Sequence, residues 1–431
     1  MMKRLRRGFE SASIPLLAVI LGLTVSSVFS LIARTNPIDT YSHMFCEGFG
    51  ARGCVTFGDM FIMQVIPEEG ENAGLAQTVF SPLYGDGGHR LAVVLEWATP
   101  LILTALSATV AFQAGMFSIG MDGQLVLGAI TVAFLGYWLP ERIYELAGVT
   151  DPDTADITLR QVMWLVIPAI CISAAMAVGA AYSWIAGYLK VKLNVNELIS
   201  TIILNALAVQ IVGYLVNNPL RSDNNSTART QRIDDTAWLV PFNQGLLPDI
   251  EWFKGARLGI GIIIAIIAAL LVWFFLWRST AGYEQRMTRG SGLFARFGGI
   301  PTGKAALRAM LISGALSGLA GAIMILGVER RLVDGFANSG TGFTGVLVAI
   351  LARESVLGIL IVAMFFAGLQ QGAINLQFGD IPRQLGSMII SFIILFSAME
   401  EFFRSNIARL RARLRPNRAA NVEPIKGGTT S

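Results

Sequence analysis

The chain alternates long apolar runs with short polar segments. Crossing the hydrocarbon core of a bilayer takes about 20 apolar residues as an α-helix. Runs of that kind lie at 13–33, 92–112, 119–138, 162–188, 197–216, 258–277, 309–328, 356–375 and 385–403, and a shorter tenth run lies at 341–353. None alternates as the strands of a membrane β-barrel do. The pattern predicts an all-α integral membrane protein with about ten transmembrane helices.

Two glycine-broken polar segments interrupt this pattern. The first spans 114–130, from Ala-Gly-Met-Phe to Leu-Gly-Ala-Ile, and the second spans 338–353. At membrane depth, opened backbone is tolerated only where it is buried in protein or lines a wet cavity, because lipid cannot satisfy freed N–H and C=O groups. Glycine also occurs in membrane helices for close packing alone. We interpret the two segments as facing each other across a transport path.

The order of elements repeats around these segments. Residues 92–216 give a long helix, a short broken segment and two further helices, and residues 309–403 give the same order. Short Gly-interrupted elements at matching places in two units of opposite orientation are typical of an inverted-repeat transporter. The repeat favours broken helices that serve transport.

Composition agrees with a membrane protein, because 54% of the 431 residues are hydrophobic and 14% are charged, against about a quarter charged in soluble domains. The three cysteines and two histidines show no metal-ligand spacing, so no metal site is predicted. Cys46 and Cys54 share one polar loop. They form a disulfide if that loop lies in an oxidising compartment, and two free thiols are the alternative.

Basic residues gather at the N-terminus, at Lys190 and Lys192, in 278–308 and in the C-terminal tail. By the positive-inside bias these segments are cytoplasmic, and so are both termini. The basic tail is typical of an anchor for anionic lipid rather than of a nucleic-acid arm. The expected division is 1–12 cytoplasmic N-terminus, 13–33 first transmembrane helix, 34–91 extracytoplasmic loop, 92–216 first repeat unit, 217–257 extracytoplasmic loop, 258–277 linking helix, 278–308 cytoplasmic coupling loop, 309–403 second repeat unit and 404–431 basic cytoplasmic tail.

Polar groups inside the spans are few and nearly uncharged, which favours a neutral hydrogen-bonding solute over an ion. Glu197 has two interpretations, because a carboxylate in a first helical turn also offsets the helix dipole. Phe117 and Phe343 either stack on a ring of the solute or pack against the core or lipid. The candidate path residues are Phe117, Ser118, Asp122, Gln124, Asn196, Glu197, Asn205, Phe343 and Gln370.

The loop 278–308 is the longest predicted cytoplasmic stretch between helices. A short amphipathic helix near 291–297 would expose Phe294 and Phe297 to a partner or to the lipid interface. Gly298–Lys304 matches the start of a phosphate-binding loop, but Ala305 replaces the Ser or Thr that holds magnesium. No catalytic set accompanies it, so we expect neither an enzyme nor a bound cofactor, and any energy would come from a partner or a gradient.

Several motifs, taken in order, resemble the permease subunits of bacterial ATP-binding-cassette importers for nucleosides and simple sugars. The resemblance covers most of residues 92–400. The family usually has Asn at the position of Ser118 and Ala-Glu at Met121-Asp122. Because this chain differs there, the resemblance does not identify the solute. The motifs are Pro100-Leu-Ile-Leu-Thr, Gly115-Met-Phe-Ser-Ile-Gly-Met-Asp-Gly-Gln-Leu-Val-Leu-Gly, Asn196-Glu-Leu-Ile-Ser-Thr-Ile-Ile-Leu-Asn205, Arg296-Phe-Gly-Gly-Ile, Ile312-Ser-Gly-Ala-Leu-Ser-Gly-Leu-Ala-Gly-Ala and Gly342-Phe-Thr-Gly-Val-Leu-Val-Ala-Ile-Leu-Ala-Arg.

The resemblance implies a type II importer fold in the bacterial inner membrane, with ATP hydrolysed by a separate tandem ATPase. It also implies a second homologous permease, forming a heterodimer, and an extracytoplasmic solute-binding lipoprotein. An ion-coupled secondary transporter of a small neutral solute is the alternative. The residues that the resemblance assigns to ATPase coupling are Glu284, Arg286, Phe294, Arg296, Phe297 and Gly299.

Overall fold

The computed structural model describes residues 19–50, 62–65, 77–80, 89–148, 157–222, 227–242, 257–376 and 382–398. Within these ranges seven helices are long and apolar enough to cross a membrane, or eight if Val19–Ile32 and Pro37–Phe49 form one span. The all-α membrane fold is therefore confirmed. The count of ten is not confirmed, because Phe336–Leu351 and Gln384–Ile393 are shorter apolar helices.

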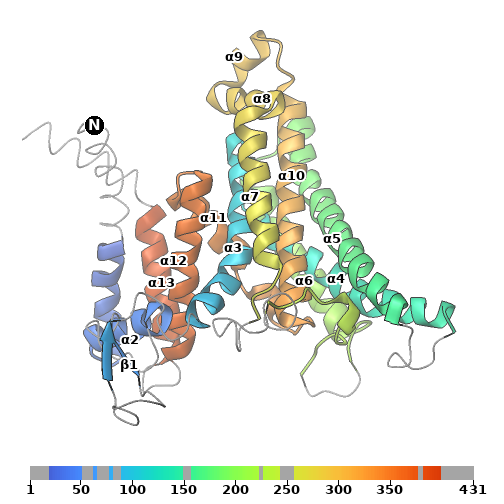
Figure 1. Ribbon diagram of the computed structural model, residues 1–431. Helices are drawn as coiled ribbons and strands as arrows, with labels where there is room; N and C mark the ends of the chain where they lie inside the picture. Colours follow the sequence, from blue (N-terminus) through green and yellow to red (C-terminus); the bar gives the residue numbers. More distant parts are fainter. Residues whose placement is uncertain are drawn as a thin grey trace, which may run out of the picture. The chain divides into compact units, whose positions relative to one another are not determined.

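The described helices follow the apolar runs closely, and 162–188 extends to Ile157–Leu193. Residues 30–387 form the main unit. Two short antiparallel strands, β1 (Ile62–Val65) and β2 (Gln77–Phe80), were not predicted. The helices of the unit are α2 (Pro37–Phe49), α3 (His89–Gln113), α4 (Met121–Leu146), α5 (Ile157–Leu193), α6 (Glu197–Asn217), α7 (Gly261–Arg278), α8 (Thr280–Gly290), α9 (Gly292–Phe297), α10 (Thr302–Ile323), α11 (Thr341–Leu351) and α12 (Val356–Asn375) (Figure 1). Short 3₁₀-helices lie at η4 (Asp235–Ala237) and η7 (Phe336–Asn338), and the π-helix η6 (Met324–Glu329) continues α10.

A second unit holds the described parts of the chain ends, namely residues 19–29 and 388–398. The latter belong to α13 (Arg383–Ala398). Within this unit the rings of Phe29 and Phe392 stack at a centroid distance of 5.1 Å. Aromatic stacking and apolar burial thus join the two terminal segments.

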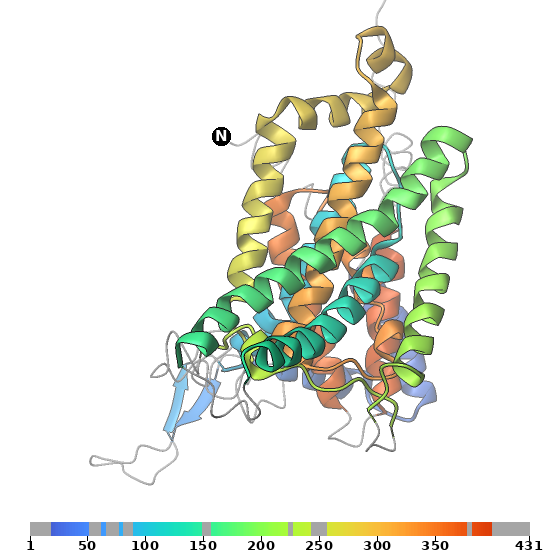
Figure 2. The ribbon, with the colours of Figure 1, turned by 90° about the vertical axis from the view of Figure 1, so that its right-hand side faces the viewer.

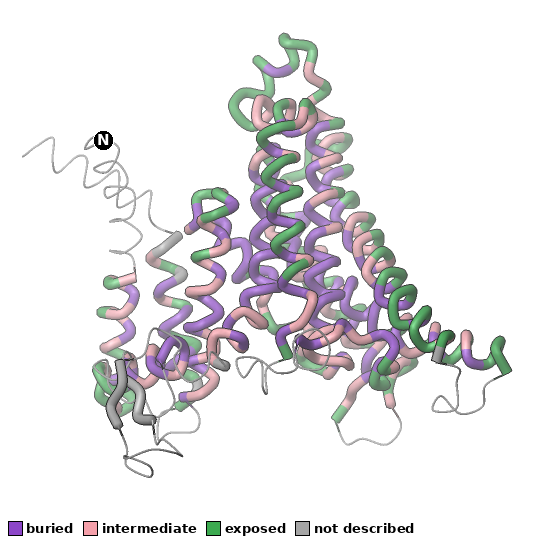
Figure 3. The backbone as a smooth tube through the Cα atoms, viewed as in Figure 1, coloured by how far each residue is buried: buried purple, intermediate pink, exposed green. Residues whose placement is uncertain are grey.

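The core of the main unit is built around α10, which packs against α3, α4 and α5. Of the apolar window of α10, 78% is buried, against 33% for α5 and 28% for α6. The contrast between buried and exposed helices is visible in Figure 3. Leu270 and Leu271 on α7 are more than half exposed. Exposed apolar faces of this kind suit contact with lipid.

Small residues let α10 approach its neighbours closely. A Cβ atom built on Gly318 would overlap the backbone of Ala175 on α5, and the Cβ position of Gly128 on α4 lies 2.9 Å from the Gly318 Cα. Buried hydroxyls add polar contacts, because Ser107 on α3 donates to the Ser313 carbonyl oxygen at 2.7 Å. Without a hydrophobic force between helices in lipid, such close packing and interhelical hydrogen bonds hold a membrane bundle together.

The long helices α3 and α10 run in opposite directions between the two ends of the bundle. The end of α3 lies beside α8, because a Cβ on Gly115 would sit 3.3 Å from the Arg289 Cα. The start of α10 also lies beside α8, where Arg308 Nη2 and Glu284 Oε2 form an ion pair at 2.9 Å. Figure 2 shows α8 lying across this end of the bundle, between α7 and α10. The predicted opposite orientation of the two repeats is consistent with this arrangement.

We predict that Gly318→Ala destabilises the helix bundle, because the added methyl group cannot be placed without moving α5 away from α10. Overpacking of this kind costs about 1–3 kcal/mol, and the melting temperature of the detergent-purified protein should fall. Gly213→Ala is the matched control, because nothing lies within 4 Å of a Cβ at that helical position. Equal melting temperatures for the two variants would contradict the packing argument.

Candidate functional site: two broken helices and an exposed loop

The first broken element is the non-helical segment 114–120 between α3 and α4. Its first turn needs Gly115, whose φ of +75° lies in the left-handed region that a residue with a Cβ rarely adopts. Phe117 is 46% exposed and stacks on Phe112 at 4.9 Å. Ser118 is fully buried and its hydroxyl accepts a bond from Gly120 N–H at 3.3 Å. One aromatic face is thus available while the polar side chain beside it is turned inward.

Helix α6 satisfies the backbone groups that the break leaves open. The amide of Asn205 donates to the Ile119 carbonyl oxygen at 2.7 Å, and its Oδ1 accepts from Gly123 N–H at 2.9 Å. Thr201 Oγ1 accepts from Ile119 N–H at 3.3 Å. Each unsatisfied backbone group in hydrocarbon would cost several kcal/mol. Asn205 was predicted to line the path, and in the structure its side chain forms hydrogen bonds with the backbone of Ile119 and Gly123. The role of Thr201 was not predicted from the sequence.

Asp122 joins the two broken elements directly. It lies in the first turn of α4, and its carboxylate accepts from Gly342 N–H at 2.7 Å and from Phe343 N–H at 3.0 Å. These are orphan donors at the start of α11, where Gly340 has a φ of +66° and offers no capping side chain. A carboxylate at a helix N-terminus is stabilising. The start of α4 is therefore in direct contact with the start of α11, and residues 341–351 of the second predicted break form a regular helix. That the two segments face a transport path stays a prediction.

Two further path candidates lie close to this junction. Gln124 is 2% exposed, and its Oε1 has no hydrogen-bond partner among the described residues. Phe343 at the start of α11 is 44% exposed. The junction thus presents exposed aromatic surface beside a buried polar group whose acceptor oxygen is unused.

Asn196 and Glu197 stand apart from the junction, at the start of α6. Asn196 is the N-cap of α6 and accepts from Leu198 N–H at 2.9 Å. Glu197 Oε2 forms an ion pair with Lys190 Nζ at 2.7 Å. Of the two interpretations of Glu197, this partner favours the structural one.

Gln370 lies half-buried in α12, and no hydrogen bond among the described residues joins it to the junction. Near the end of α12, Asn375 donates to Glu47 Oε2 at 3.2 Å, and Arg90 pairs with the same oxygen at 3.2 Å. This polar cluster ties α2, α3 and α12 together.

The loop between α7 and α10 folds into two short helices. Ser279 caps α8 and Ser291 caps α9 through their hydroxyl groups. As predicted, α9 leaves Phe294 and Phe297 uncovered, at 65% and 92% exposure. These two rings form an exposed apolar tip, and exposed apolar patches of this kind mark sites of interaction with a protein or a membrane.

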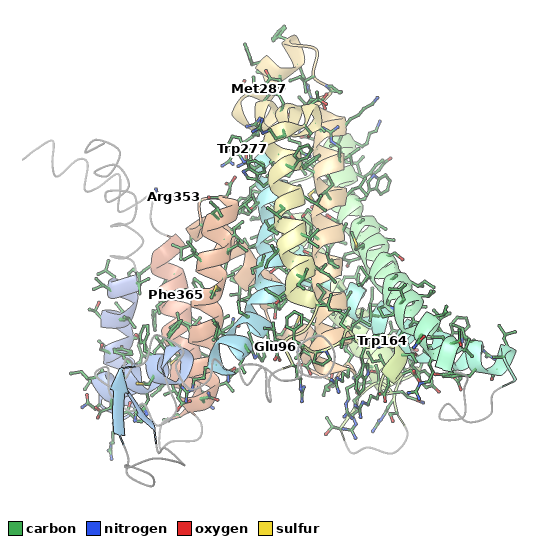
Figure 4. All side chains as sticks on the ribbon, viewed as in Figure 1. Glu96, Trp164, Trp277, Met287, Arg353 and Phe365 are labelled. Atoms are coloured by element: carbon green, nitrogen blue, oxygen red, sulfur yellow. The ribbon has the colours of Figure 1, made fainter. Side chains whose placement is uncertain are left out.

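The charged residues of this loop are held by neighbouring groups. Glu284 pairs with Arg308, the Arg286 guanidinium lies 4.4 Å from the ring centroid of Trp277, and Arg296 donates to Thr302 Oγ1 at 3.0 Å. Figure 4 shows Trp277 and Met287 at this end of the bundle. Gly299 has a φ of +79° and turns the chain toward α10. The apolar tip therefore stands on a base fixed by ion pairs and stacking.

Cys46 is disulfide-bonded, while Cys171 is free and buried; Cys54 lies outside the described residues. In the described part of the chain, no three His, Cys, Asp or Glu side chains are grouped to hold a metal ion. The bond at Cys46 agrees with the disulfide alternative for its loop.

Residues 90–398 match the family model for the permease component of branched-chain amino acid transport systems. The chain belongs to this permease family. The match covers both broken elements and the exposed loop. It identifies the chain as a transport subunit rather than an enzyme, and it favours the importer over an ion-coupled secondary transporter.

The permease is similar over most of its length to several characterised proteins. It is 29% identical to the guanosine ABC transporter permease protein NupP of Bacillus subtilis, over 93% of this chain and 97% of that one. It is 28% identical to the glucose permease TsgB13 of Haloferax volcanii, over 95% and 92%. It is 27% identical to the nucleoside permease NupB of Lactococcus lactis, over 93% and 94%. No solved structure matches the permease significantly.

We predict that Asp122→Ala lowers the thermal stability of the permease more than Asp122→Asn does. Alanine leaves two backbone N–H groups of α11 without an acceptor, and the part-buried one, Gly342 N–H, costs about 1–3 kcal/mol when unsatisfied. Asparagine keeps one acceptor oxygen. Melting curves of the purified variants provide the measurement, and an alanine variant as stable as wild type would show that the carboxylate does not hold α11.

Proposed function

We propose that the permease imports a nucleoside or a simple sugar into the bacterial cytoplasm, with the energy supplied by a separate tandem ATPase. The names of its relatives support this solute class, because NupP is a guanosine permease, NupB a nucleoside permease and TsgB13 a glucose permease. All these solutes are neutral molecules rich in hydrogen-bonding groups.

The observation that carries the proposal is that the acids near the path are already engaged. Both carboxylate oxygens of Asp122 accept backbone N–H groups of α11, and Glu197 is paired with Lys190. A path coupled to an ion through ionisable side chains would need charge that is free to interact with the ion, and neither carboxylate offers it. The other candidate side chains at the junction, those of Phe117, Gln124 and Phe343, are uncharged, which suits a neutral solute.

The proposed path runs along the junction of the two broken elements. Phe117 and Phe343 would offer aromatic faces to a nucleobase or to the apolar face of a sugar. Gln124 Oε1 would accept a hydrogen bond from the solute once the elements separate. Ser118, Asn196, Glu197, Asn205 and Gln370 would act from behind this surface, holding the backbone that shapes it or lining its ends.

The partners follow from the exposed surfaces and from the relatives. The apolar tip at Phe294 and Phe297 would dock into the ATPase on the cytoplasmic side. Two B. subtilis guanosine permease proteins match this chain, NupP at 29% and NupQ at 24% identity, which supports a heterodimer with a second homologous permease. An extracytoplasmic solute-binding lipoprotein would deliver the solute at the opposite end. Both termini would then be cytoplasmic in the inner membrane.

Uptake by the reconstituted complex tests the proposal. The permease should be co-expressed with its neighbouring ATPase and second permease, placed in liposomes, and given radiolabelled guanosine, cytidine or glucose with and without ATP and the binding protein. Uptake should require both ATP and the binding protein. The radiolabelled solute that is taken up fastest identifies the solute class. Uptake driven by an ion gradient without ATP would contradict the proposal.

The docking assignment has its own test in the double variant Phe294→Asp/Phe297→Asp. Two charges on the apolar tip should prevent co-purification of the ATPase while membrane insertion stays normal, because burying unpaired carboxylates in an interface is strongly unfavourable. Leu146→Asp is the matched control, since Leu146 is 89% exposed at the end of α4. Normal co-purification of the ATPase with the double variant would refute the docking assignment.

A further inference from the structure

A single carboxylate joins the exposed loop to both broken elements. Glu354 lies in the turn between α11 and α12, and its side chain is only 14% exposed. Its Oε2 accepts a hydrogen bond from Gln113 Nε2 at 2.8 Å and forms an ion pair with Arg289 Nη1. Gln113 is the last residue of α3, immediately before the first break. Arg289 is in the last turn of α8.

Backbone contact reinforces these side-chain bonds. Gly115, the left-handed residue that opens the first break, packs directly on the backbone of Arg289. Arg353 and Glu354 both have left-handed φ values, +51° and +58°. Such values are uncommon outside glycine and persist only where the surroundings hold them. The turn that carries Glu354 is therefore held in an unusual conformation, and its carboxylate reaches Arg289 on α8. Figure 4 labels the neighbouring Arg353 in this turn.

The two broken elements are linked to each other at two depths. Glu354 and Gln113 link them beside α8, and Asp122 links them at the start of α11. The 11 residues of α11 separate these two links by roughly 16 Å, at about 1.5 Å per residue. Joined at both ends of α11, the elements form one mechanical unit, and Arg289 is the side chain that attaches α8 to it.

We infer that the bonds of Glu354 to Arg289 and Gln113, which we call the Glu354 tether, transmit movement of the ATPase-docking loop to the broken helices that line the path. The inference rests on the proposed function and adds the residues that couple it. The exposed rings of the docking tip belong to α9, whereas the tether is formed by Arg289 at the end of α8 and by Glu354, whose side chain is only 14% exposed. The tether should thus affect coupling without affecting docking.

Arg289→Ala and Glu354→Gln test the tether in the reconstituted complex, with ATP hydrolysis and solute uptake measured on the same liposomes. Both variants should retain the ATPase, and solute uptake per ATP hydrolysed should fall roughly tenfold, within the range by which residues along a coupling network change it. Arg289→Lys keeps the positive charge and should recover most of the ratio. Glu145→Gln, which removes the acid of the exposed Arg142–Glu145 ion pair on α4, is the matched control and should leave it unchanged.

Three results would overturn the tether. These are an unchanged uptake-to-ATP ratio in both variants, a loss of ATPase co-purification, and failure of Arg289→Lys to differ from Arg289→Ala. Failure of the proposed function is distinguishable, because then the wild-type complex itself would show no ATP-dependent uptake.

Discussion

The structure of the permease depends on the need to satisfy the backbone groups that a break in a membrane-spanning bundle leaves open. The chain abandons the helix over 114–120, and the groups set free there are taken up by side chains of α6. At the start of α11, the free N–H groups are taken up by Asp122. Lipid offers no substitute for these bonds. The polar side chains that make them, those of Asn205, Thr201 and Asp122, are therefore required wherever the helix is interrupted. The positions of these polar side chains determine where non-helical backbone can exist in this bundle.

This constraint separates a rigid part of the molecule from a part that can rearrange. Helix α10 is packed through glycines and buried hydroxyls against three neighbours, and interiors packed to that density do not deform gradually. The non-helical segment 114–120 is held largely by hydrogen bonds to α6, whereas α11 also packs closely on α3, where a Cβ on Gly345 would overlap Thr104 Oγ1. Exchanging hydrogen bonds requires smaller changes than repacking a helix interface, so the segment 114–120 can rearrange more easily than the interfaces of α10 and α11.

Much of the fold and part of the site could be read from the sequence. Hydropathy located the long helices, and glycines within apolar flanks located the non-helical segment 114–120, because each signal depends on residues close together in the chain; residues 341–351 of the second predicted break instead form the regular helix α11. The exposure of Phe294 and Phe297 followed from the short amphipathic pattern. The partner of Asp122 could not be inferred, since its contacts lie 220 residues away in sequence. Thr201 and Glu354 were missed because a lone Thr in an apolar helix and a lone Glu in a turn give no signal until their partners are known.

The sequence distance between Asp122 and α11 has a consequence for biogenesis. A membrane chain enters the bilayer as it is synthesised, so α4 arrives long before Gly342 and Phe343 exist. During that interval the Asp122 carboxylate lacks the two N–H donors that it has in the finished protein. The first half of the permease can therefore complete its fold only after the second half has been inserted, which makes insertion of the two repeats interdependent rather than sequential.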